Sequence, residues 1–132
     1  MTVIWKYKID LTNSNVFQEI EKKRGITFPK ELKDFISSTN ASTPSRCKFM
    51  IGNNEKVFGS VLSFNCNERD TDSVFIALSV IKDANLIPIG IDPFGNYICY
   101  SLKDNTVVFW NHEDGNITST GLSLDNFINS LY

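Results

Sequence analysis

The side chains with the greatest capacity for chemistry are His112, Glu113 and Asp114, which are consecutive, and Asp92 in an earlier turn. One imidazole with several carboxylates has the composition of a metal site or of a general acid–base pair. The sequence lacks the HExxH spacing that places two histidines on one helical face. Adjacent residues of an extended segment point to opposite faces, so His112 and Glu113 would not converge on one substrate. We therefore predict no catalytic residue and no metal site. A small hydrolase using His112 with Asp92 is the enzymatic alternative.

Other catalytic and cofactor motifs are also missing from the sequence. It has no GxxxxGK phosphate loop, no GxGxxG and no GxSxG. The three cysteines, Cys47, Cys66 and Cys99, are widely spaced and form no CxxC pair, so they indicate neither a disulfide framework nor a zinc site. Cys99 lies in an apolar run and is expected to be a small buried hydrophobe. We predict a protein that is not an enzyme and needs no cofactor.

The charge is unevenly distributed along the 132 residues. Residues 1–56 carry ten Lys and Arg against six Asp and Glu, and residues 57–132 carry three against nine. An acidic C-terminal half favours a basic partner. It argues against direct nucleic-acid binding, because a stacking platform for single strands needs interleaved basic residues. The alternative is that these acids only decorate turns and helix starts.

Acidic and aromatic residues of the predicted turns are the candidates for contact with a protein partner. Aromatic anchors often dominate binding energy, and acids speed association with a basic surface. The alternative for the aromatic residues is core packing, and His112 is also expected to end a strand and satisfy a neighbouring carbonyl. The candidate partner-binding residues are Glu68, Asp70, Asp92, Phe94, Asp104, Trp110, His112, Glu113 and Asp114.

The composition predicts one domain, residues 1–132, without a membrane span. Hydrophobic residues make up 42% and charged residues 21%, which favours a packed core over disorder. No apolar run approaches the roughly 20 residues that a membrane helix needs. The N-terminus shows no secretory signal, so we expect a cytoplasmic protein, and a homo-oligomer is left open.

Turn residues divide the second half of the chain into an antiparallel meander. Proline, glycine and asparagine in Asp92–Asn96 suit a hairpin loop between two apolar runs. A second turn follows at Lys103–Thr106, and a third apolar run extends from there to His112.

A separate hairpin is predicted earlier in the chain, from Lys48–Ile51 and Lys56–Phe64. Gly59 inside its second run marks a bulge or a close backbone approach.

Amphipathic segments predict four helices. The first has a capping box of Asn15 and Gln18 and stops at Gly25, and Pro29 occupies the first position of the second. The third is capped by Asp72 or Thr71 and runs to about Ile81, with a strand as the alternative, and Ser123 caps the last. These elements predict an α+β fold: a mainly antiparallel sheet of about five strands covered on one face by helices, with two N-terminal helices and one C-terminal helix.

Several blocks resemble the SUKH superfamily, which includes fungal cell-wall-synthesis regulators of the SMI/KNR type and many bacterial immunity proteins. The matching motifs occur in the expected order, from about Phe17 to Leu131. Residues 38–41 depart from the pattern, since the family often has an Asn-Gly helix stop there. The resembling blocks are Ile26–Ile36, Val57–Phe64, Leu86–Cys99, the Trp-x-His-Glu segment ending at Glu113, and Ser123–Leu131.

The resemblance implies a SUKH-like fold and a binding protein. Bacterial members typically neutralise the toxic C-terminal domain of a polymorphic toxin, frequently a nuclease, by direct association. We therefore predict an immunity protein whose partner is a basic toxin domain. The alternative is a cytoplasmic regulator or adaptor of the cell-wall-regulator type that binds an endogenous partner.

Overall fold

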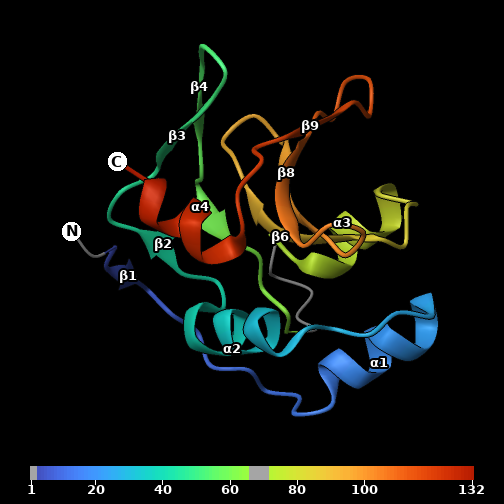
Figure 1. The fold of residues 1–132 in the computed structure, drawn as a ribbon. Coiled ribbons are helices and arrows are strands. Elements are labelled where there is room, and N and C mark those ends of the chain that lie inside the picture. Colours follow the sequence, from blue (N-terminus) through green and yellow to red (C-terminus); the bar gives the residue numbers. More distant parts are fainter. Residues whose placement is uncertain (1–2, 66–71) are drawn as a thin grey trace.

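A meander of antiparallel strands forms the centre of the molecule (Figure 1). The computed structural model describes residues 3–65 and 72–132, and within them this central sheet has five strands in sequence order. The strands are β5 (Ser60–Val61), β6 (Leu86–Ile91), β7 (Tyr97–Ser101), β8 (Thr106–Trp110) and β9 (Ile117–Ser119). Every residue of β7 and nearly every residue of β6 is buried, so both faces of the sheet are covered.

Two short ribbons and the helices surround this sheet. The ribbons are β1 (Trp5–Lys6) with β2 (Thr43–Pro44), and β3 (Lys48–Ile51) with β4 (Asn54–Val57). The helices of the described residues are α1 (Val16–Arg24), α2 (Lys30–Thr39), α3 (Val74–Val80) and α4 (Leu124–Ser130). The predicted α+β class is therefore confirmed.

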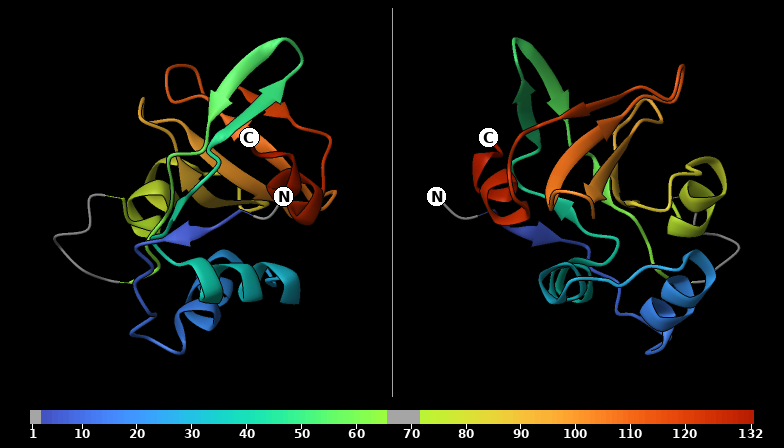
Figure 2. Two further views of the ribbon diagram at one scale, coloured as in Figure 1. Left: turned by 90° about the vertical axis from the view of Figure 1, so that its left-hand side faces the viewer. Right: turned by 45° about the vertical axis from the view of Figure 1, so that its right-hand side comes forward.

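Helices lie on both sides of the sheet, whereas cover on one face was predicted. The sheet stands between α3 and α4 in both views of Figure 2. On the α4 side, the Phe127 ring lies 5.0 Å from Phe49 and 6.0 Å from Phe58, between ring centroids. On the other side, α3 buries Val74 and Ala77 and packs beside β6. Two-sided cover explains why the central strands read as continuous apolar runs.

Glycine is required where the chain crosses from the β3–β4 ribbon to the central sheet. The Gly59 amide donates to the Ile91 carbonyl at 2.9 Å, and a Cβ at Gly59 would lie 2.7 Å from that same oxygen. The predicted close backbone approach is confirmed. The single strand predicted over residues 56–64 is wrong, because the chain leaves β3 after Val57 and pairs with β6 instead.

The helix ends agree with the sequence in part. Ser123 accepts from the Asn126 amide at 3.3 Å, and Gly25 ends α1 with φ +69°, both as predicted. The capping box of Asn15 and Gln18 is wrong, since Asn15 makes no side-chain cap. Its amide instead donates to the Asn13 side chain at 2.9 Å.

Two further helix starts differ by a residue or two. Pro29 is the N-cap of α2, one position before the helix begins. For α3 the helix prediction is confirmed over the strand alternative, but the cap is Ser73, whose hydroxyl accepts from the Phe75 amide at 3.1 Å. Asp72 is therefore not the cap, and Thr71 lies outside the described residues.

Candidate protein-binding surface

The turn between β6 and β7 is organised around the Asp92 carboxylate. Its Oδ1 accepts from the backbone amides of Phe94 at 2.9 Å and Asn96 at 2.8 Å, and its Oδ2 accepts from Asn96 Nδ2 at 2.9 Å. Gly95 completes the turn with φ +89°. Asp92 is only 7% exposed. Its carboxylate therefore holds the loop together and is not available to a partner.

Asn96 joins this turn to the neighbouring turn between β8 and β9. Its Oδ1 accepts from the His112 amide at 3.0 Å and lies 2.7 Å from His112 Nδ1. Because a carbonyl oxygen only accepts, this contact places the proton on Nδ1. His112 thus satisfies a carbonyl at the end of β8, as expected, although that carbonyl belongs to a side chain. Asn96 stands between Asp92 and His112, which is not the geometry of an acid–base pair.

The turn between β8 and β9 is also held by its own side chains. Asp114 accepts from the Asn116 backbone amide and side-chain amide, each at 2.9 Å. Asn111 Oδ1 accepts from the Glu113 amide at 2.9 Å. The Glu113 and Asp114 side chains are exposed, so two carboxylates stand on a turn whose backbone is fixed.

Two aromatic residues accompany these acids at the same end of the sheet. Phe94 is 73% exposed at the tip of its turn. Trp110 is half-buried and packs on Tyr97, with ring centroids 5.7 Å apart. Burial raises the pKa of Tyr97, with a further contribution from the Asp72 charge. We call Phe94, Trp110, His112, Glu113 and Asp114 the turn-end surface.

Asp104 lies at the opposite end of the sheet, in the turn between β7 and β8. The five residues of β7 separate the two ends by about 15 Å. The Asp104 carboxylate accepts from the Thr106 hydroxyl at 2.8 Å, and hydrogen bonds from Thr106 and then Ser101 lower its pKa. It does not belong to the turn-end surface. Glu68 and Asp70, also candidates, lie outside the described residues.

A polar groove of about 190 Å³ adjoins the turn-end surface and was not predicted. It lies between the β3–β4 ribbon and strands β8 and β9, and Asp114 is one of its lining residues. The Lys56 ammonium lies 4.7 Å from the centroid of the Phe109 ring and fixes the ribbon against the sheet. Met50 is exposed on this ribbon. Met50 does not line the groove, whereas its neighbour Ile51 does.

The described residues supply little for metal or thiol chemistry. In residues 3–65 and 72–132, no group of three or more His, Cys, Asp and Glu side chains could hold a metal ion. Cys99 is buried, and burial raises the pKa of its thiol, which opposes a nucleophilic role. Cys47 is a free, partly buried cysteine, and Cys66 lies outside the described residues.

The helices of the described residues are short. The longest, α2, has 10 residues, and none of them has the length and apolar composition to cross a bilayer.

Comparison with known proteins identifies the family. No curated protein matches the chain. The model of the SMI1/KNR4 family (SUKH-1) matches residues 12–130, a range that contains the central sheet, α1 to α4 and the turn-end surface. The chain therefore belongs to the SMI1/KNR4 family (SUKH-1).

Proposed function

We propose that this chain is an immunity protein that binds the toxic domain of a cognate bacterial toxin, a basic nuclease, and neutralises it through the turn-end surface. The observation that carries the proposal is the exposure of Phe94 on a turn whose backbone is held by hydrogen bonds to the buried Asp92. A rigid aromatic anchor loses little entropy on binding. Family membership supports a protein-binding role in general.

The charges of the turn-end surface fit a basic partner. Glu113 and Asp114 are exposed on one turn, beside the half-buried Trp110. Carboxylates at the edge of an interface accelerate association with a positive surface, while desolvated aromatic contacts slow dissociation. The protein then acts by covering the toxin, and it makes or breaks no covalent bond. It acts in the compartment where the toxin acts, which in this proposal is the cytoplasm.

The test is growth rescue combined with binding kinetics. The toxin-like domain encoded beside this gene would be expressed with and without the chain, and association would be measured at several salt concentrations. We expect Phe94→Ser to accelerate dissociation and the double variant Glu113→Lys/Asp114→Lys to slow association by about tenfold. Asp104→Lys is the matched control, because this acid lies at the other end of the sheet.

Two outcomes would contradict the proposal. If Asp104→Lys slowed association as much as the double variant, net charge and not the turn-end surface would govern binding. If the neighbouring gene encoded no toxin and the chain rescued no cell, the alternative of a regulator or adaptor with an endogenous partner would replace immunity.

A further inference from the structure

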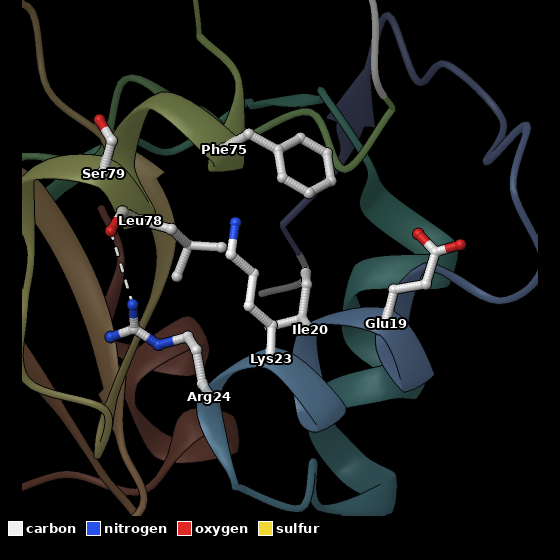
Figure 3. Close-up of a pocket in the computed structure, with 7 residues that line it drawn as sticks. All are labelled: Glu19, Ile20, Lys23, Arg24, Phe75, Leu78 and Ser79. Atoms are coloured by element: carbon white, nitrogen blue, oxygen red, sulfur yellow. Dashed lines mark hydrogen bonds between the residues drawn. The ribbon is translucent and has the colours of Figure 1, made fainter.

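A pocket of about 320 Å³ lies between α1 and α3 (Figure 3), and none of its lining residues belongs to the turn-end surface. Its apolar lining comes from Ile20 of α1 and from Phe75 and Leu78 of α3. Ile20 is buried, whereas Phe75 is 36% exposed at the pocket's edge. The pocket has room for one or two apolar side chains of another molecule.

The charged residues around this pocket are not equivalent. Arg24 donates to the carbonyls of Ile81 at 3.2 Å and Asp83 at 2.7 Å, so it is committed to the segment that follows α3. The Glu19 carboxylate accepts from Asn13 Nδ2 at 3.1 Å. Lys23 extends from α1 toward α3 and lines the pocket together with Leu78 (Figure 3). Within the described residues, the Lys23 ammonium makes no ion pair or hydrogen bond.

The outward face of α3 continues the apolar lining. This helix, with the sequence VFIALSV, contains no charged residue. Besides Phe75, it exposes 48% of Ile76 and 49% of Val80. A surface helix normally places polar residues on its solvent face, and an exposed apolar patch marks an interaction site.

We propose that the pocket and the outward face of α3 form a second docking surface, which binds an acidic amphipathic segment of a partner protein. One apolar side chain of that segment fills the pocket, its other apolar side chains cover Ile76, and a neighbouring carboxylate pairs with Lys23. A peptide segment fits better than a small molecule, because the exposed apolar area extends along the helix beyond the pocket. The charge preference is opposite to that of the turn-end surface, so this inference does not depend on the proposed function.

The test uses a displayed library of random peptides, selected on the immobilised full chain. We expect the selected peptides to combine Leu, Ile or Phe with Asp or Glu, and to shift the backbone amide NMR signals of α1 and α3. The variants are Lys23→Glu, which reverses the available charge, and Phe75→Asp, which places a carboxylate at the pocket's edge. Each should weaken binding by about tenfold or more. Lys22→Glu is the matched control, since Lys22 is exposed on α1 but does not line the pocket.

Several results would overturn the inference. Selection of basic or uncharged peptides would exclude the role of Lys23. If Lys22→Glu lowered peptide affinity as much as Lys23→Glu, the effect would come from the overall positive charge of α1 and not from a pair with Lys23. If the peptides shifted only the amide NMR signals of the turn-end surface, they would bind there and not at the pocket. Self-association of the chain that Phe75→Asp abolishes, measured by sedimentation velocity, would identify the occupant as a second copy. None of these results bears on growth rescue by the Phe94 variant.

Discussion

The two ends of the central sheet are built differently. At the turn-end surface, two neighbouring turns are tied to each other through Asn96, and Phe94 projects from them. At the other end, the β7–β8 turn is tied to the rest of the protein. The Tyr100 hydroxyl lies 2.6 Å from Glu31 of α2 and 3.2 Å from Asn105 in the turn, and the Leu102 amide donates to Asn85 at 2.8 Å.

The two ends differ in how many of their side chains are used to hold the fold and how many are left exposed. The β7–β8 turn uses its hydrogen bonds to fasten a helix to the sheet, so its side chains are engaged in the fold. The turns of the turn-end surface hold their backbones through hydrogen bonds to Asp92, Asn111 and Asp114, which leaves the Phe94 and Glu113 side chains available at low entropic cost. Our proposal therefore assigns binding to the end that is held by its own turns and not by a helix.

Among substitutions that test this difference between the two ends, Asp92→Ala is expected to have the largest effect on stability. The change leaves the amides of Phe94 and Asn96 without their acceptor, and hydrogen bonds to a charged group are the strong ones. We expect the free energy of unfolding to fall by about 2–4 kcal/mol, measured by urea denaturation. Asp92→Asn, which keeps the shape, should lose less. A loss below about 0.5 kcal/mol for Asp92→Ala would mean that the turn does not depend on this carboxylate.

At the other end, Tyr100→Phe removes the link to α2 without opening a cavity. Tyr100 is fully buried, and its hydroxyl contacts Glu31 and Asn105. We expect a loss of about 1 kcal/mol in the free energy of unfolding and, under the proposed function, no change in toxin binding. Faster dissociation from the toxin in this variant would show that the two ends are coupled.

Tyr100 also makes this end sensitive to alkali. Burial, and then the hydrogen bond and charge of Glu31, raise the pKa of Tyr100 above its ordinary value of 10.0. The stability that depends on the neutral phenol is fully present below pH 10 and is lost as the pH rises above it. We expect the free energy of unfolding, measured by urea denaturation, to fall in this range, with a contribution from Tyr100 of up to about 1.4 kcal/mol per pH unit. In Tyr100→Phe the fall should be shallower, because only Tyr97 then retains a raised pKa among the tyrosines of the central sheet. If the two proteins lost stability equally steeply with pH, the raised pKa of Tyr100 would not be the cause.

The smallest effect is expected for His112→Ala. The side chain is exposed, and the backbone amide of residue 112 keeps its hydrogen bond to Asn96. We expect a change of less than about 0.5 kcal/mol in stability and full protection of cells. Complete loss of protection with toxin binding intact would revive the hydrolase alternative.

The sequence predicted the meander well because turn chemistry is local. Asp92–Asn96 carries its own proline and glycine, and Ser123 caps α4 within three residues, so neither depends on distant contacts. The capping box at Asn15 failed because Asn13, two residues earlier, offered a competing acceptor. The strand from Lys56 to Phe64 was wrong because periodicity does not show when a chain changes its pairing partner. Gly59 was the one local sign of that change.

The candidate surface was predicted only in part for a similar reason. The sequence by itself determined the three consecutive strands between Leu86 and Trp110, the positions of the turns and the acidity of the second half. The pairing of β5 with β6 and of β9 with β8 was decided by the tertiary structure. Two of the turns carry an aspartate and a Gly-Asn pair, at Asp92 and at Asp114, and nothing local distinguishes them. The tertiary structure decides which aspartate is buried, because the backbone at Gly59 packs against Asp92. A Cβ built at Gly59 would lie 3.5 Å from the Asp92 Cα. Burial depends on such contacts between segments distant in the sequence. Both carboxylates accept hydrogen bonds within their turns, but only Asp92 is withdrawn from solvent, whereas Asp114 stays exposed.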